Sequence, residues 1–369
     1  MNRRTALSRL GAAALGAALP FAALARDGFN PFLAEEDNPL AAPWAAWKAA
    51  YLTDDGRVVD SLQKGASHSE SQGYGLLLAA LFGDDAAFDS IFAWTEANLA
   101  IRGDALLAWR WLPQGSQAVP DRNNASDGDL FYAWGLVLRG TRDGAPALID
   151  RAGAIARDLV ATCVRPAPDG SGRLLFLPAA QGFVQGDSLV INPSYYMPRA
   201  MREVARATGT RDLAVCAADG ETLMADLARD GLIPDWIAIG PSGTAIPEGR
   251  EDRNGYEAIR VPLFLLWSGN TAHPALMRQA QAYRRAENSG QASAGNHVTV
   301  FARASGDVIE TSRHVGYGAV AGVVDCAVGD RRGSAIARYR TQDQAYYPAT
   351  LHLMALIAQI TAAPECVPL

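Results

Sequence analysis

A glutamate lies among small polar residues and glycines in the segment 67–75, SHSESQGYG, immediately before the apolar run 76–81. This pattern places Glu70 on the first turn of a largely buried helix, shielded by Tyr74. Burial would raise the pKa of Glu70, and a carboxyl group that stays protonated near neutral pH can act as a general acid. The simpler alternative is a helix-start glutamate in a capping arrangement with Ser67. The glycines would let a substrate approach the backbone closely.

The segment 123–130, NNASDGDL, also ends a loop at a predicted helix start. It places two aspartates, one of them Asp127, at the N-terminus of that helix, where plain capping explains them. A DxD pair can bind a divalent cation, but no third acidic or histidine ligand lies nearby in the sequence. The metal interpretation is therefore disfavoured.

Glu257 and Arg260 lie three residues apart in the segment 254–260, NGYEAIR, within one helical turn of Tyr256. On a surface they would form a simple ion pair. A buried Arg260 would instead keep Glu257 ionised, as a general base must be.

Missing motifs narrow the chemistry further. The sequence has no GxxxxGK[ST], HExxH or GxSxG motif, and its five histidines are not spaced as metal ligands. Carboxylates among aromatic residues suit cleavage of a sugar acetal: an acid protonates the leaving oxygen, a base activates water and flat rings stack on the sugar. We expect no metal or cofactor.

The favoured sugar platforms are Trp109 and Trp111. They are preferred to three tryptophans whose helical spacing is more typical of a core: Trp94, Trp134 and Trp236.

The first 25 residues have the pattern of an export signal. Arg3, Arg4 and Arg9 precede an Ala/Leu/Gly-rich run, and the segment 23–25, ALA, offers a cleavage site. The segment 3–7, RRTAL, also fits a twin-arginine signal. No later segment approaches the roughly 20 apolar residues that a membrane span needs. We therefore expect a soluble protein that is periplasmic or secreted.

The charge balance disfavours a nucleic-acid partner. The chain has 33 basic and 39 acidic residues, and three of the basic residues belong to the leader, so the mature chain carries a net charge of −9. Phosphate binding requires a cationic footprint that this sequence lacks, whereas a neutral polysaccharide requires none.

In an oxidising compartment, four cysteines allow two bridges in any of three connectivities, and the alternative is four buried thiols: Cys163, Cys216, Cys326 and Cys366.

Apolar residues at helical spacing recur along the whole chain, and no linker divides it in the middle. Predicted helices begin after Asp84, run from Leu130 to Gly140 and from Pro198 to Gly209, and close the chain around 351–358. Short β-hairpins are predicted in three loops, at 172–178, 235–247 and 297–311, and a mobile surface loop at 287–296. No alternation of strands and helices appears, so the fold class is all-α, with helix pairs arranged in a ring.

These segments together resemble glycoside hydrolase family 8. The blocks ASDGD at 125–129, followed by AWGL, and SESQGYG at 69–75 are similar to two signatures of that family. The blocks NPSYY at 192–196, YEAIR at 256–260 and the closing tyrosine pair 346–347 follow in the family's order. The resemblance covers roughly residues 40–360, and within the family it points to the periplasmic endoglucanase encoded with bacterial cellulose synthase.

The resemblance implies an (α/α)6 barrel of six inner and six outer helices, formed by residues 26–369 as one catalytic domain. It also implies an endo-β-1,4-glucanase that hydrolyses internal bonds of a cellulose-like glucan with inversion. Glu70 then matches the general acid, and Asp127 matches a carboxylate that positions the distorted sugar. Tyr195 matches a tyrosine that helps to hold that sugar and the water, and two flanking residues of the active site are matched by Tyr256 and Arg260.

The base is less clearly assigned, because the position of Glu257 is usually aspartate in the cellulase-like branch. A glutamate reaches one methylene further, yet inverting enzymes tolerate carboxyl separations of roughly 6.5–9.5 Å. We keep Glu257 as the expected base, with Asp127 and then Asp252 as alternatives.

Two other interpretations stay open from the sequence. The same mechanism could act on chitosan, xylan or a mixed-linkage glucan, and an altered Glu257 could leave a glycan-binding scaffold without catalysis. The expected partner is a β-1,4-glucan, and the resemblance adds the cellulose synthase machinery.

Overall fold

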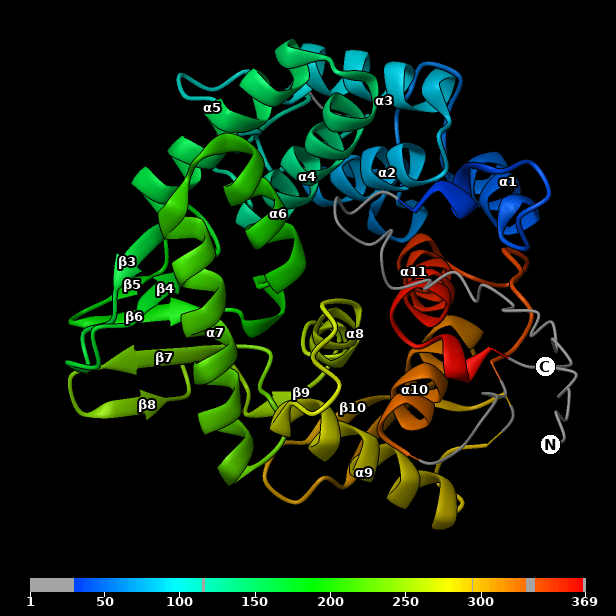
Figure 1. The fold of residues 1–369 in the computed structure, drawn as a ribbon. Coiled ribbons are helices and arrows are strands. Elements are labelled where there is room, and N and C mark those ends of the chain that lie inside the picture. The colour runs from blue at the N-terminus through cyan, green and yellow to red at the C-terminus, as the bar shows by residue number, and fades with distance from the viewer. Residues whose placement is uncertain (1–29, 115–116, 294, 330–335, 368–369) are drawn as a thin grey trace, which may run out of the picture.

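A computed structural model describes residues 30–114, 117–293, 295–329 and 336–367 of the chain, so the predicted leader, residues 1–25, lies outside the described residues. Eleven α-helices dominate the described residues and wind around a common centre (Figure 1). In chain order they are α1 (Ala41–Tyr51), α2 (Ser69–Leu81), α3 (Asp85–Asn98), α4 (Ser126–Asp143), α5 (Pro146–Cys163), α6 (Pro198–Thr208), α7 (Arg211–Asp230), α8 (Arg260–Trp267), α9 (Pro274–Asn288), α10 (Val315–Val328) and α11 (Tyr346–Ala362).

The helices divide into inner and outer ones by how they are buried. Helices α2, α4, α8 and α11 are buried around most of their circumference, whereas α3, α5, α7 and α9 bury one face. The sequence explains the difference, because a helix that is apolar all round is stable only inside the protein. Figure 1 shows α8 near the middle, enclosed by its neighbours. The predicted all-α architecture is confirmed.

The helix ends follow the local signals. Asp84 caps α3 by accepting the N–H of Ala87 at 3.1 Å, and α6 ends at Gly209, whose φ of 74° suits glycine. The prediction that α4 stops at Gly140 was wrong, since this helix continues to Asp143. Gly140 instead allows α5 to pack closely, because a Cβ there would lie 2.8 Å from Ile149.

The strands are short and form four antiparallel sheets in the described residues. The predicted hairpins at 235–247 and 297–311 are confirmed. The segment 172–178 contains a single strand, Leu174–Phe176, whose partner Val164–Pro166 lies before the predicted range. The predicted loop at 287–296 starts two residues later than expected, because α9 runs to Asn288, and residue 294 lies outside the described residues. The sheets pair β1 (Ser67–His68) with β2 (Arg110–Trp111); β3 (Val164–Pro166) with β4 (Leu174–Phe176); β5 (Val184–Gln185), β6 (Ser188–Ile191), β7 (Ile237–Gly240) and β8 (Gly243–Ala245) in that order; and β9 (Arg253–Asn254) with β10 (His297–Ala302) and β11 (Val308–Ser312).

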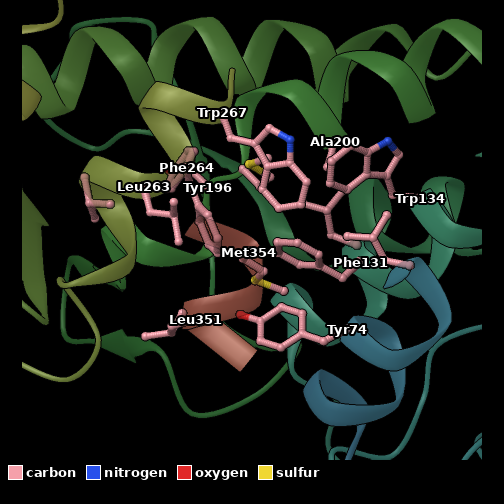
Figure 2. Packing of buried hydrophobic residues seen from close by; sticks show 14 of the residues in the cluster. Tyr74, Phe131, Trp134, Tyr196, Ala200, Leu263, Phe264, Trp267, Leu351 and Met354 are labelled. Carbon is pink, nitrogen blue, oxygen red and sulfur yellow. The ribbon is translucent and has the colours of Figure 1, made fainter. Parts of the chain in front are cut away.

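Aromatic side chains from the inner helices pack into one core (Figure 2). Tyr74 meets the edge of Phe131 with ring centroids 4.7 Å apart, and Trp134 lies 5.5 Å from Trp267. The indole N–H of Trp134 is also satisfied, because it donates to buried Glu203 at 2.6 Å. Trp134 is therefore a core residue and not a sugar platform.

Two glycines bring the start of α2 against the start of α4. A Cβ on Gly73 would lie 2.8 Å from the carbonyl oxygen of Gly128, and a Cβ on Gly128 would lie 2.6 Å from the backbone nitrogen of Glu70. The expectation that the glycines of the 67–75 segment admit substrate was wrong for Gly73 and Gly75, which face other helices and core side chains. The absent side chains of Gly73 and Gly128 allow the short distance between the start of α2, which carries Glu70, and the helix that carries Asp127.

One disulfide is present in the described residues. Cys326 in α10 is bonded to Cys366 beyond the end of α11, which ties the last helix to its neighbour. Cys163 and Cys216 are buried thiols. Among the described helices, none combines the length and the apolar character that crossing a bilayer requires.

The glycine contact predicts the effect of Gly128→Ala. The added methyl group meets backbone atoms of Ser69 and Glu70, which cannot move independently, so we expect a destabilisation of about 1–3 kcal/mol and a displaced Glu70. Urea unfolding and hydrolytic rate measure the two effects. Gly103→Ala is the matched control, because its Cβ would meet nothing within 4 Å. A Gly128→Ala protein with unchanged stability and rate would contradict this packing argument.

Candidate active site

One buried arginine organises the carboxylates that the sequence singled out. Arg260 is the first residue of α8 and is only 1% exposed. Burial alone would lower the pKa of Arg260, but the surrounding hydroxyl and carboxyl groups hold that pKa well above its usual range. Its terminal nitrogens reach five side chains: Nη1 donates to Glu70 (2.7 Å), Tyr74 (3.0 Å) and Asp127 (3.2 Å), and Nη2 donates to Ser194 (2.7 Å) and Glu257.

Glu70 lies on the first turn of α2 with its carboxyl group aimed at Arg260. The alternative of a cap formed with Ser67 was wrong, because Ser71 closes the helix start by accepting the N–H of His68 at 2.9 Å. The side chain of Glu70 therefore does not cap the helix. Its side chain is 22% exposed and contributes to the wall of a cavity.

The electrostatic surroundings favour a protonated Glu70. Burial is the main cause that raises its pKa, to about 8; Arg260 opposes the shift, and the nearby Asp127 and Glu257 add to it. The charge balance at Arg260 acts in the same direction as burial, since one guanidinium cannot neutralise three carboxylates in a poorly solvated site. Because Oε2 accepts from Arg260, the acid form of Glu70 carries its proton on the other oxygen.

Glu257 lies in the turn that precedes α8 and is the most exposed of the three carboxylates, at 34% of its side chain. Its Oε2 accepts from Arg260 and from the amide of Asn192 at 3.0 Å. Both donors stabilise a carboxylate. The structure thus places beside Glu257 the buried arginine that the sequence argument requires.

Asp127 lies deeper than the sequence resemblance implied. It is 2% exposed, accepts the N–H of Gly128 at 2.8 Å, and burial raises its pKa to about 6. It is absent from the walls of the cavities described below, so contact with a sugar stays a prediction. Tyr195 lies against the same arginine, with its ring centroid 5.6 Å from the guanidinium carbon of Arg260.

Two neighbouring cavities meet at the Tyr256–Glu257 turn and form an open groove. The larger has a volume of about 480 Å³ and the smaller about 410 Å³. The larger is lined by Asp60, Leu62, Gln63, Glu70, Tyr256, Glu257, Arg260, Ser312, His314, Tyr317, Ala345, Tyr347 and Pro348. The smaller is lined by Asp235, Trp236, Gly249, Arg250, Glu251, Arg253, Tyr256 and Glu257.

Aromatic residues form much of this groove, but not the pair that the sequence favoured. Trp236 lines the smaller cavity with Arg250 over its ring at 4.2 Å. Trp109 precedes β2 and Trp111 is the last residue of that strand, and both are absent from the two cavity walls. Trp94 is 7% exposed and packs edge-on against Trp111 at 5.5 Å, so it belongs to the core.

Asp252 as a base and a metal site are the remaining alternatives that the sequence left open. Asp252 pairs with Arg303 at 3.7 Å and contributes to neither cavity wall, so the structure does not support it as a base. Throughout the described segments, no three His, Cys, Asp or Glu side chains cluster as a metal site would require.

Several residues in or next to the site were not assigned from the sequence. Ser194 and Asn192 stood within the NPSYY block, and their contacts with Arg260 and Glu257 could have been sought there. Tyr347 donates to the backbone oxygen of Tyr256 at 2.6 Å, as the closing tyrosine pair could have suggested. Neither Asp60 nor Asp235 lies in a recognisable sequence motif.

Helices around a centre, with three carboxyl groups gathered on one arginine beside open cavities, are the arrangement that the resemblance to the (α/α)6 glycoside hydrolases implies. Comparisons with known proteins agree. The profile of glycosyl hydrolases family 8 matches residues 21–361. The chain belongs to this family.

Individual relatives cover most of the chain. A probable endoglucanase of Novacetimonas hansenii is 38% identical over 236 residues, which is 63% of this chain and 68% of that protein. An endoglucanase of Xanthomonas axonopodis pv. citri is 34% identical over 331 residues, 87% of this chain and 79% of that protein. The solved structure of endo-beta-1,4-glucanase CMCax from Acetobacter xylinum superimposes with a TM-score of 0.77 at 32% identity, over 88% of this chain and 98% of that one.

The central role of Arg260 predicts large effects of its replacement. Arg260→Met leaves three carboxylates without their cation, so we expect a loss of about 3–5 kcal/mol in the free energy of unfolding and loss of hydrolysis. Arg260→Lys keeps a charge but lacks the planar fork, and we expect it to fold while losing roughly 100-fold in kcat.

Denaturant titration and initial rates test both variants. Arg139→Met is the control, because Arg139 forms ion pairs at the surface with Asp85, Asp89 and Asp143. We expect this variant to lose about 1 kcal/mol or less in the free energy of unfolding. An Arg260→Lys enzyme with the wild-type kcat would show that the fork is unnecessary.

Proposed function

We propose that this protein is an endo-β-1,4-glucanase that hydrolyses internal bonds of a cellulose-like glucan with inversion. The observation that carries the proposal is the groove, which extends to both sides of Glu257 while Glu70 and Glu257 bind opposite nitrogens of Arg260. Space on both sides of the base allows sugars to bind on either side of the cleaved bond, as attack within a chain requires. The names of the relatives, endoglucanase and endo-beta-1,4-glucanase, support the substrate.

The proposed reaction uses two carboxyl groups and one water molecule. Glu70 gives its proton to the glycosidic oxygen as the bond from that oxygen to the anomeric carbon breaks. Water attacks the same carbon from the opposite face, and Glu257 takes a proton from it. The products are a new reducing end and a new non-reducing end, and exchange with solvent returns the proton from Glu257 to Glu70. The reaction requires no cofactor.

Glutamate in place of the usual aspartate is compatible with a base at position 257. The longer side chain reaches Arg260 and Asn192 with one oxygen, Oε2, and no hydrogen bond to the other oxygen is seen within the described residues. That second oxygen is available to orient water. The tolerance of inverting enzymes for roughly 6.5–9.5 Å between carboxyl groups leaves room for this reach.

We also propose that the protein is exported to the periplasm and acts on glucan made by the cellulose synthase machinery. The support is the leader-like pattern of residues 1–25, the Cys326–Cys366 disulfide, which suits an oxidising compartment, and the resemblance described above.

Release of reducing ends from carboxymethylcellulose tests the enzymatic proposal. We expect activity from the wild type and a fall of at least roughly 100-fold in Glu70→Gln, which cannot donate a proton. Glu365→Gln is the matched control, because Glu365 is exposed in a short helix after α11. Equal rates for wild type and Glu70→Gln, or no rate from wild type, would leave the scaffold interpretation instead.

The same assay distinguishes the preferred substrate and shows whether the enzyme cleaves within the chain or from its ends. An endo enzyme lowers the viscosity of the polymer early, when few reducing ends have appeared. Chitosan, xylan and a mixed-linkage glucan are run in parallel at equal mass. Faster cleavage of any of these than of carboxymethylcellulose would replace the cellulose-like substrate while keeping the mechanism.

A further inference from the structure

Asp235 lies in the groove beside the turn that carries Glu257, although no motif marks it. It precedes β7, is only 3% exposed, and contributes to the wall of the smaller cavity with Glu257. Burial raises the pKa of Asp235, and the charge of Glu257 adds to this effect, whereas backbone N–H groups oppose it. A carboxylate held at this position must be stabilised by specific donors.

Those donors are the backbone N–H groups on either side of the catalytic turn. Oδ1 of Asp235 accepts from Gly255 at 2.8 Å and from Ala258 at 2.9 Å. The pair encloses Tyr256 and Glu257, the two residues that line both cavities. One oxygen atom therefore fixes both ends of the turn.

The remaining contacts make the arrangement rigid. The backbone N–H of Asp235 donates to the carbonyl oxygen of Arg253 at 2.9 Å, and the guanidinium of Arg253 contacts Oδ2 at 3.3 Å. Gly255 fits closely against the carboxylate, since a Cβ there would lie 2.7 Å from Oδ2. A shift of Asp235 would therefore move the turn and the side chain of Glu257 with it.

We infer that Asp235 is a positioning residue for the base: its carboxylate holds the 255–258 turn so that Glu257 meets the attacking water. The inference rests on the proposed function. It assigns to Asp235 no contact with the reacting atoms. The expected consequence is specific to the chemical step, because a misplacement of the base by about 1 Å costs roughly 100-fold in rate while sugar contacts elsewhere in the groove persist.

The test compares Asp235→Ala with Asp235→Asn. The alanine loses both acceptors, so we expect kcat on carboxymethylcellulose to fall roughly 10- to 100-fold while KM changes less than about 3-fold. The asparagine keeps an amide oxygen that can accept both N–H groups, and we expect it to restore much of the lost kcat. Asp219→Asn is the control, because Asp219 also accepts a backbone N–H, from Leu174 at 2.8 Å, but contributes to neither cavity wall.

Thermal unfolding of each variant accompanies the kinetics. Should Asp235→Ala fail to fold, Gly255→Ala takes its place, since its Cβ pushes the turn away from Oδ2 and should lower kcat in the same way. Unchanged kcat, or a rise of KM that accounts for the whole loss, overturns the inference. An inactive wild type would instead defeat the proposed function, so the two failures are distinguishable.

Discussion

A single buried cation facing three carboxyl groups is the constraint on which the site depends. Arg260 is 1% exposed, and Glu70, Asp127 and Glu257 all bind its terminal nitrogens. These side chains come from three helix starts that are distant in sequence, and a guanidinium is the one side chain whose fork serves several acceptors in a plane. The surrounding ring of helices can be understood as the scaffold that brings those helix starts together.

Charge balance at Arg260 links function to stability. The pKa of Glu70 is about 8 in the folded protein, against an ordinary value of 4.5, so the folded state binds this proton more tightly than the unfolded chain. Its effect on stability is most favourable below pH 4.5 and declines as the pH rises towards 8, because the unfolded chain releases this proton over that range while the folded protein retains it. The property that makes Glu70 a proton donor at neutral pH therefore has a stability cost in alkaline solution.

Local patterns in the sequence predicted most of the helices and singled out residues that the fold brings together. Glu70, Glu257 and Arg260 stood in short blocks whose composition was unusual, and helix caps such as Asp84 were visible as single residues. The sequence could not show which of these segments lie close together in the folded protein. Glu70 and Arg260 are 190 residues apart, and only closure of the ring makes them neighbours.

The failed expectations have the same origin. Aromatic residues at helical spacing look alike whether they face a core or a groove, so Trp134 and Trp236 could not be separated by periodicity. Glycines near Glu70 suggested substrate access, whereas Gly73 meets the backbone of Gly128 in a neighbouring helix. Asp235 stood alone in an ordinary loop, and its role depends on two backbone N–H groups about 20 residues further on.

Direct titration of Glu70 examines the charge arrangement without relying on catalysis. In protein labelled with ¹³C at glutamate side chains, the carboxyl resonance that disappears in Glu70→Gln is followed from pH 3 to pH 10, on the order of one point per half unit. The account predicts a midpoint at about 8. A midpoint near the ordinary value of 4.5 would mean that Glu70 is ionised at neutral pH, and this result would contradict the assignment of Glu70 as the proton donor.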